Sequence, residues 1–74
     1  MDMRKVMGNN VRGYRRKQNF TLEKLAILSG LHINYISSLE RGERNVGILN
    51  VAKLGKALKI PPNLLLVPDS YKVE

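Results

Sequence analysis

Apolar side chains recur every three or four residues along most of the chain, and this spacing predicts amphipathic helices. A first helix is expected over Arg4 to Lys17, with inward-facing side chains at Val6 or Met7, Val11 and Tyr14. A second is expected to start after Thr21, a good N-cap residue, and to use for packing Leu22, Leu25, Ala26 and Leu28 or Ser29. It ends at Gly30, where an unhindered backbone allows a tight turn.

The second half of the chain predicts three further helices. Ile33 to Arg41 is expected to be helical and to stop at Gly42, a typical residue for the position after a helix end. Ile48 to Leu58 combines apolar positions with lysines at helical spacing. A short fifth helix, Pro62 to Leu66, opens on a proline, as helices often do, and Pro68 ends it.

These elements form one domain. The chain has 74 residues and no cysteine, so its core must be built from aliphatic side chains without disulfides or thiolate metal sites. A chain this short buries only about 60% of its unfolded surface, so its core is marginal and dimerisation would help it. We predict a compact, all-α, five-helix domain over residues 1–68 and a flexible C-terminal tail over residues 69–74.

The charge balance favours a polyanionic partner. Thirteen lysines and arginines against six acidic residues give a formal net charge of +7, although surplus lysines can also serve solubility alone. The first seven residues lack the apolar stretch of a signal peptide. No apolar run approaches the roughly 20 residues of a membrane-spanning helix, so we expect a cytoplasmic, nucleoid-associated protein without membrane contact.

No residue pattern indicates an enzyme or a metal centre. No nucleophile is paired with a base, and no glycine-rich loop could cradle a phosphate group. His32 is the single histidine, and the six carboxylates are scattered along the chain. We expect no catalysis, no metal, no cofactor and no small-molecule ligand.

The stretch from Thr21 to Arg41, TLEKLAILSGLHINYISSLER, is the most informative part of the chain. It predicts two short amphipathic helices joined by a tight turn at Gly30. This is the outline of a DNA-binding helix-turn-helix, which places its second helix in the major groove. Double-stranded DNA is therefore the expected partner.

Four segments in this order resemble the XRE, or lambda-repressor-like, helix-turn-helix family: VRGYRRKQNFT, KLAILSGL, YISSLERGERN and LNVAKLGKALKIPPNLLL. The resemblance covers about residues 7–66, most of the chain. The segment NYISSLERGERN is similar to controller proteins of restriction–modification operons and to short phage-type repressors. The resemblance implies a five-helix DNA-binding domain in which the second and third helices form the motif. It also implies a sequence-specific transcriptional regulator, either a repressor or a controller.

The resemblance implies roles for individual residues. The positions that usually face base edges are Ile33, Asn34, Ser37 and Ser38. The positions that usually lie near phosphates are Thr21, Leu22, His32, Tyr35, Arg41 and Arg44. Arg15 and Glu40 match an ion pair between the first and third helices that family members often bury.

The chemistry of the base-facing residues leaves alternatives open. Asn34 can pair in bidentate fashion with adenine, worth about 1–3 kcal/mol of discrimination, or can be an ordinary polar residue of the helix's first turn. Ser37 and Ser38 can donate to DNA or can be neutral exposed residues. Ile33 can contact a thymine methyl group, or can cover Leu31.

The phosphate positions carry similar alternatives. His32 can lie near a phosphate or cap the third helix, and Tyr35 can donate to a phosphate or pack on the second helix. Arg44 and Asn45 follow the third helix in a loop that is expected to run along a DNA backbone, or Arg44 is a solvated surface charge. Arg16 belongs to the densest basic run of the chain and adds backbone electrostatics or simply a solvated face.

A homodimer is expected because one recognition helix reads too few base pairs for useful selectivity. Two-fold pairing would set two such helices one DNA turn apart, about 34 Å, on a pseudo-palindromic operator. The predicted pairing surface lies on the fifth helix and the outer face of the fourth and includes Ile60, Leu64, Leu65 and Val67. These side chains could instead seal the base of the domain. The alternative function is a protein-interaction or antitoxin-like adaptor with weak DNA binding, since Leu22 cannot hydrogen-bond a phosphate.

Overall fold

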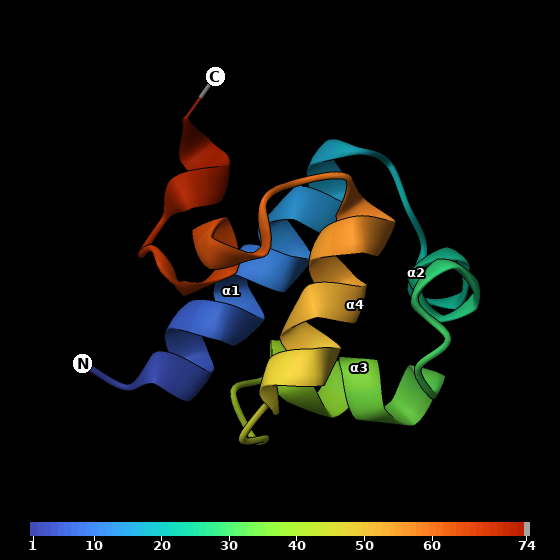
Figure 1. The fold of residues 1–74 in the computed structure, drawn as a ribbon, viewed down its shortest axis with the longest axis horizontal. Helices are drawn as coiled ribbons and strands as arrows, with labels where there is room; N and C mark the ends of the chain where they lie inside the picture. Colours follow the sequence, from blue (N-terminus) through green and yellow to red (C-terminus); the bar gives the residue numbers. More distant parts are fainter. Residues whose placement is uncertain (74) are drawn as a thin grey trace.

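The structure, a computed structural model, describes residues 1–73. Its elements in chain order are α1 (Met3–Lys17), α2 (Leu22–Ser29), α3 (Ile33–Glu40), α4 (Ile48–Leu58) and the 3-10 helices η1 (Pro62–Leu66) and η2 (Ser70–Lys72). Figure 1 shows α3 below α1 and α4, with α2 on one flank and the two 3-10 helices on the opposite side. Residues 1–73 contain no strand, which confirms the all-α prediction.

The prediction of a fifth α-helix is wrong. Pro62–Leu66 forms a 3-10 helix, in which the Leu64 N–H donates to the Pro61 oxygen at 3.0 Å and the Val67 N–H donates to the Leu64 oxygen at 3.2 Å. Two successive prolines and only five residues provide too few N–H donors for a stable α-helical turn. The bounds of the other four helices agree with the predicted bounds to within one residue.

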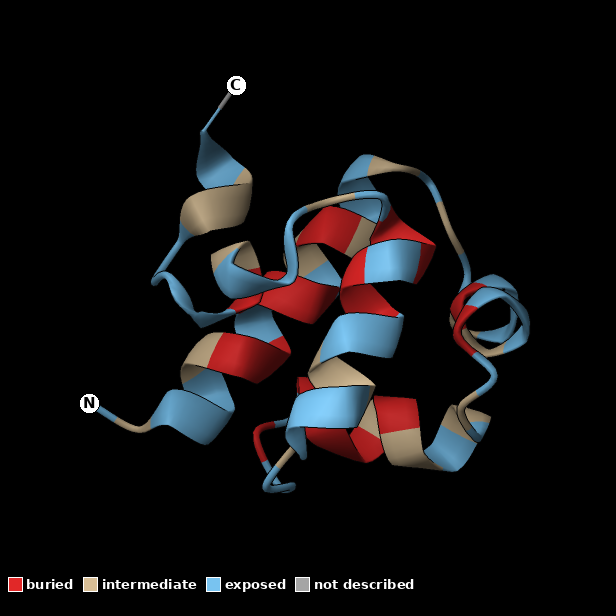
Figure 2. Ribbon diagram, in the orientation of Figure 1, coloured by how far each residue is buried: buried red, intermediate tan, exposed pale blue. Residues whose placement is uncertain are grey.

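The four α-helices and η1 enclose a small aliphatic core. Figure 2 shows the buried positions on the faces that the helices turn toward one another. The buried apolar residues are Met7, Val11, Tyr14, Leu25, Ile36, Leu39, Leu54, Ala57, Leu58 and Leu65. Leu65 is 0% exposed, so its predicted place in an intersubunit surface is wrong because its side chain belongs to the core of the domain.

The last residues pack against α1, whereas a flexible tail was expected over residues 69–74. Tyr14 donates its hydroxyl proton to Ser70 Oγ at 2.9 Å, and the ring of Tyr71 lies over Gly13. Lys17 Nζ donates to the backbone oxygens of Tyr71 and Val73 at 3.1 and 2.9 Å. These contacts extend the folded domain to the end of the described residues. Position 74 of the expected tail lies outside them.

Candidate nucleic-acid interface

Three local features build the turn between α2 and α3. Thr21 caps α2, because its hydroxyl oxygen accepts from the Lys24 N–H at 3.0 Å. Gly30 follows with a φ of +72°, a left-handed conformation that glycine adopts without steric cost. His32 then caps α3, because its Nδ1 accepts from the Asn34 N–H at 3.1 Å. The Thr21 cap and the turn at Gly30 are as predicted, and of the two roles open to His32 the helix cap is present.

The first two turns of α3 present a polar edge to solvent. Asn34 is exposed, and Ile33 and Ser37 are half-buried. Within residues 1–73 the Asn34 side chain has no hydrogen-bond partner, although its backbone N–H is bonded to His32. The Asn34 amide is therefore available to a ligand that approaches α3.

Ser38 does not belong to that edge. Its side chain is buried, its hydroxyl donates to the Tyr35 backbone oxygen at 2.8 Å, and its Oγ accepts from Arg44 Nε at 2.9 Å. The prediction that Ser38 contacts base edges is wrong, because α3 turns this position toward the interior. Ser38 instead fixes the start of the following loop by holding Arg44.

The exit from α3 is ordered by a glycine and an exposed charge network. Gly42 has a φ of +77°, and its N–H donates to the Leu39 oxygen at 2.9 Å, which makes it the predicted glycine after the helix end. Arg41 donates through Nη1 to Ser37 Oγ at 2.8 Å and through Nε to Glu43 Oε2 at 3.1 Å. The hydrogen bond from Arg41 lowers the pKa of Glu43 below its usual value, so this network is charged at neutral pH.

Tyr35 connects the exit loop to α4. The Arg44 guanidinium lies 5.8 Å from the centroid of the Tyr35 ring, a distance at which a cation is attracted to the ring face. The Tyr35 hydroxyl oxygen accepts from Asn50 Nδ2 at 3.2 Å and retains its own proton for a further acceptor. Tyr35 can therefore support Arg44 and still donate to a phosphate.

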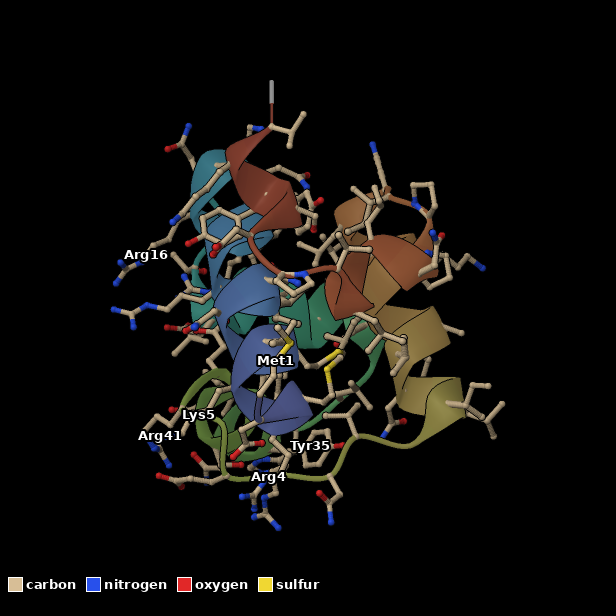
Figure 3. The ribbon with its side chains drawn as sticks, turned by 90° about the vertical axis from the view of Figure 1, so that its left-hand side faces the viewer. Met1, Arg4, Lys5, Arg16, Tyr35 and Arg41 are labelled. Carbon is tan, nitrogen blue, oxygen red and sulfur yellow. The ribbon has the colours of Figure 1, made fainter. Side chains whose placement is uncertain are left out.

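The exposed cations labelled in Figure 3 fall into two groups. Figure 3 shows Arg4, Lys5 and Arg41 at the same end of the molecule as Tyr35, whereas Arg16 lies apart from them. Lys5 lies against the exit loop, because its side chain occupies the space beside Gly42. Asn45 in the exit loop and Arg16 on α1 are both exposed. Side chains of α1 therefore contribute to the positive surface at α3 together with those of the exit loop.

A buried ion pair holds α3 against α1. Arg15 donates through Nε to Glu40 Oε2 at 2.8 Å and through Nη2 to Glu40 Oε1 at 3.0 Å, and a third bond runs from Nη1 to the Phe20 oxygen at 2.9 Å. The side chains of Arg15 and Glu40 are 12% and 7% exposed. The hydrogen bond to Glu40 raises the pKa of Arg15 above its usual value. The pair that the family resemblance implied is present, and its bidentate geometry fixes the tilt of α3.

Gly8 allows α1 and α3 to approach closely at the same place. A Cβ atom at this position would collide with the backbone oxygens of Leu39 and Glu40. The glycine costs α1 about 1 kcal/mol of helix propensity relative to alanine. The close contact that it permits explains its place in the middle of a helix.

Residues 1–73 contain no group of three His, Cys, Asp or Glu side chains placed to hold a metal ion. Over the same residues, no helix combines the length and the apolarity needed to cross a membrane.

Comparison with known proteins identifies the same arrangement of α2 and α3. The family model described as helix-turn-helix matches residues 11–65. The chain belongs to the helix-turn-helix family. The match spans most of the domain, from the middle of α1 to η1, and includes both helices of the motif.

Several similar members of the helix-turn-helix family are control proteins. Control protein C.SmaI from Serratia marcescens is 43% identical over 74 residues, which cover all of this chain and 88% of that protein. Control protein C.BamHI from Bacillus amyloliquefaciens is 46% identical over 66 residues, which cover 88% of this chain and 82% of that protein. The crystal structure of the restriction-modification controller protein C.AhdI from Aeromonas hydrophila superposes with a TM-score of 0.81 at 40% identity, covering 84% of this chain and 94% of that one.

Two residues that support this helix-turn-helix interface were not predicted from the sequence. Asn50 holds the Tyr35 hydroxyl from the first turn of α4, and Glu43 holds Arg41. No local pattern marks Asn50, because its partner lies on another helix. The spacing of Arg41 and Glu43 is a signal for a pair, since charges two residues apart can meet just beyond a helix end.

Proposed function

We propose that this protein is a sequence-specific transcriptional regulator that binds double-stranded DNA as a homodimer and serves as the controller of a restriction–modification system. The observation that carries the proposal is the polar edge of α3, where the Asn34 amide has no partner within residues 1–73 and is flanked by a basic exit loop. The similarity to C.SmaI over the whole chain supports the controller role. Such a regulator acts on the nucleoid in the cytoplasm.

The base sequence of the DNA would be recognised by a small set of side chains. Asn34 is the principal candidate, since its exposed amide can pair with adenine N6 and N7 in the major groove. Ser37 can contribute a hydroxyl, and Ile33 can contact a thymine methyl group. With Ser38 buried, three residues per subunit remain for base contacts. A second subunit is needed to reach useful selectivity.

Phosphates would be held on both sides of the recognition helix. The residues proposed for these contacts are Thr21, His32, Tyr35, Arg41, Arg44, Asn45 and Arg16. Arg41 and Arg44 are held by side-chain contacts before DNA arrives, so less side-chain entropy is lost on binding. Each phosphate that a cation neutralises steepens the dependence of log affinity on log salt by about 0.9.

The homodimer surface is proposed on the first half of α4 and on η1. Its centre is formed by exposed aliphatic side chains of Ile48, Leu49 and Leu66. Ile48 and Leu49 are 84% and 75% exposed, and two adjacent aliphatics this open favour association with a second copy. Of the residues assigned to this surface from the sequence, Val67 is exposed at its edge, while Ile60 and Leu64 are half-buried and can only support it.

The proposal is tested by selection from a random pool of duplex DNA at about 150 mM salt with competitor DNA present. The expected result is an inverted repeat whose half-site centres are about 10 base pairs apart. For a controller, the recovered site should also lie in the promoter of a restriction or methyltransferase gene of the source genome. Binding without any enriched motif and with a steep salt dependence would contradict the proposal, because a basic surface alone would then account for the affinity.

A further inference from the structure

A groove between α2 and α4 combines an apolar floor with a basic rim. The two helices lie beside one another in Figure 1. The groove has a volume of about 590 Å³, and its lining consists of Phe20, Lys24, Leu28, Ser29, Lys53, Lys56, Ala57 and Lys59. None of these residues belongs to the set proposed to contact DNA or to the proposed dimer surface.

The rim carries four positive charges and no negative one. Lys24 comes from α2, and three more lysines come from one side and the end of α4: Lys53, Lys56 and Lys59. All four are exposed, and none takes part in an ion pair among residues 1–73. An acidic ligand would therefore meet cations without having to displace carboxylates.

The floor is apolar and extends onto the open face of α2. Leu28 is 45% exposed within the groove, and Ile27 beside it is 78% exposed. Helical spacing places both side chains on the same face of α2 as Lys24. Exposed aliphatics gain nothing from phosphates or sugars, but they gain from burial against apolar side chains.

We infer that this groove binds an acidic amphipathic helix of a partner protein. The apolar side chains of that helix would lie on Phe20, Leu28 and Ala57, and its carboxylates would face the lysine rim. A helix suits a groove that lies between two helices. The inference goes beyond DNA binding, because the residues that line the groove are different from those proposed to contact bases and phosphates.

The experiment uses the full chain and two designed peptides of about four helical turns. The first peptide carries leucines every third or fourth residue and glutamates on the flanking positions. The second has serine in place of each leucine and keeps every glutamate. Binding is measured by fluorescence anisotropy at about 150 mM salt, and the site is located from backbone amide shifts of the 15N-labelled protein.

The leucine peptide is expected to bind with micromolar affinity and to shift the amides of Leu28, Lys53 and Lys56 while leaving that of Asn34 in place. The double variant Lys53→Glu with Lys56→Glu should weaken binding at least about tenfold. The double variant Arg12→Glu with Lys72→Glu also reverses two exposed positive charges, both outside the groove, and should alter affinity less than about twofold. Thermal melts establish that each variant is folded.

Three results would overturn the inference. One is the absence of saturable binding of the leucine peptide. Another is equal binding of the serine peptide, since charge alone would then explain the affinity. The third is a shift of the groove amides, and not of the α3 amides, on addition of a short random-sequence DNA duplex, which would make the groove a nucleic-acid surface.

Discussion

Arg15 ties the recognition helix to α1 through charges that are largely withdrawn from water. Arg15→Ala would leave the Glu40 carboxylate buried without its partner, and removing one member of such a pair costs about 3–5 kcal/mol. We expect the free energy of unfolding, measured by urea titration, to fall by about this amount. A loss of this size is a large share of the total free energy of unfolding of a small domain.

A double variant separates the cost of a stranded charge from the contribution of the pair. Arg15→Met combined with Glu40→Leu removes both charges and keeps apolar volume, so it should recover most of the lost stability. Arg16→Ala is the matched arginine control on an exposed face of α1, and should change stability by less than about 0.5 kcal/mol. Equal losses for Arg15→Ala and Arg16→Ala would contradict a structural role for the pair.

Asn34 and Arg44 are expected to differ in what they contribute to DNA binding. Asn34→Ala should weaken binding to the selected operator by about 1–3 kcal/mol and leave binding to a scrambled duplex unchanged. Arg44→Ala should weaken binding to both duplexes and reduce the salt slope by about one. Anisotropy titrations of both duplexes at several salt concentrations measure these effects, and identical profiles for the two variants would refute the division between base and phosphate contacts.

At the scale of the element, the α-helices were predictable because the residues that mark helix ends agree with the helical spacing of the apolar residues. Thr21, Gly30 and Gly42 mark helix ends by chemistry that needs no distant partner. The Arg15–Glu40 pair was available only through the family resemblance. Neither spacing nor charge identifies two residues 25 positions apart as partners.

The segment after α4 was not predictable in the same way. A run of four aliphatics has no period, so it does not show which side chain faces the core. Asn10 decides this in the structure, because its buried Nδ2 donates to the backbone oxygens of Leu65 and Val67 at 2.8 Å each. That anchor turns Leu65 inward. The burial of Ser38 could not be predicted for a related reason. Which face of α3 is buried depends on the tilt of that helix, and the tilt depends on contacts with residues distant in the sequence.

The end of α4 offers a way to test how a helix stop is built. Lys59 adopts a left-handed φ of +58° there, and the Ile60 N–H donates to the Gly55 oxygen at 3.0 Å. The left-handed conformation costs a residue with a Cβ about 1–2 kcal/mol, whereas glycine adopts it freely. Lys59→Gly should therefore stabilise the protein against urea by about 0.5–1 kcal/mol once the added freedom of the unfolded chain is included.

Asn19 provides the control for that substitution. It ends α1 with nearly the same φ, +59°, but asparagine tolerates the left-handed conformation better than lysine does. Asn19→Gly should therefore gain less than Lys59→Gly. A larger gain at Asn19, or a loss at Lys59, would show that side-chain contacts outweigh backbone strain at these helix ends.

At the scale of the molecule, the described residues carry three separate surfaces. The α3 edge and exit loop are polar and basic, the first half of α4 with η1 is apolar, and the α2–α4 groove combines both characters. The exposed face of α4 changes from Ile48 and Leu49 at its start to lysines at its end. One helix can thus serve a second copy of the chain at one end and a different partner at the other.

The stability of a dimer that folds and associates together depends on protein concentration. A hundredfold increase in concentration should add about 2.7 kcal/mol per dimer, or about 1.4 kcal/mol per subunit. At about 4–8 °C per kcal/mol for a domain of this size, the melting temperature should rise by about 5–11 °C. Leu49→Lys places a charge in the proposed surface and should abolish the concentration dependence and give a monomer in sedimentation equilibrium. Ile27→Lys changes an equally exposed aliphatic on α2 and should leave a dimer. If Leu49→Lys sedimented as a dimer, or Ile27→Lys as a monomer, the pairing surface would have to lie elsewhere, and with it the spacing expected between the two recognition helices.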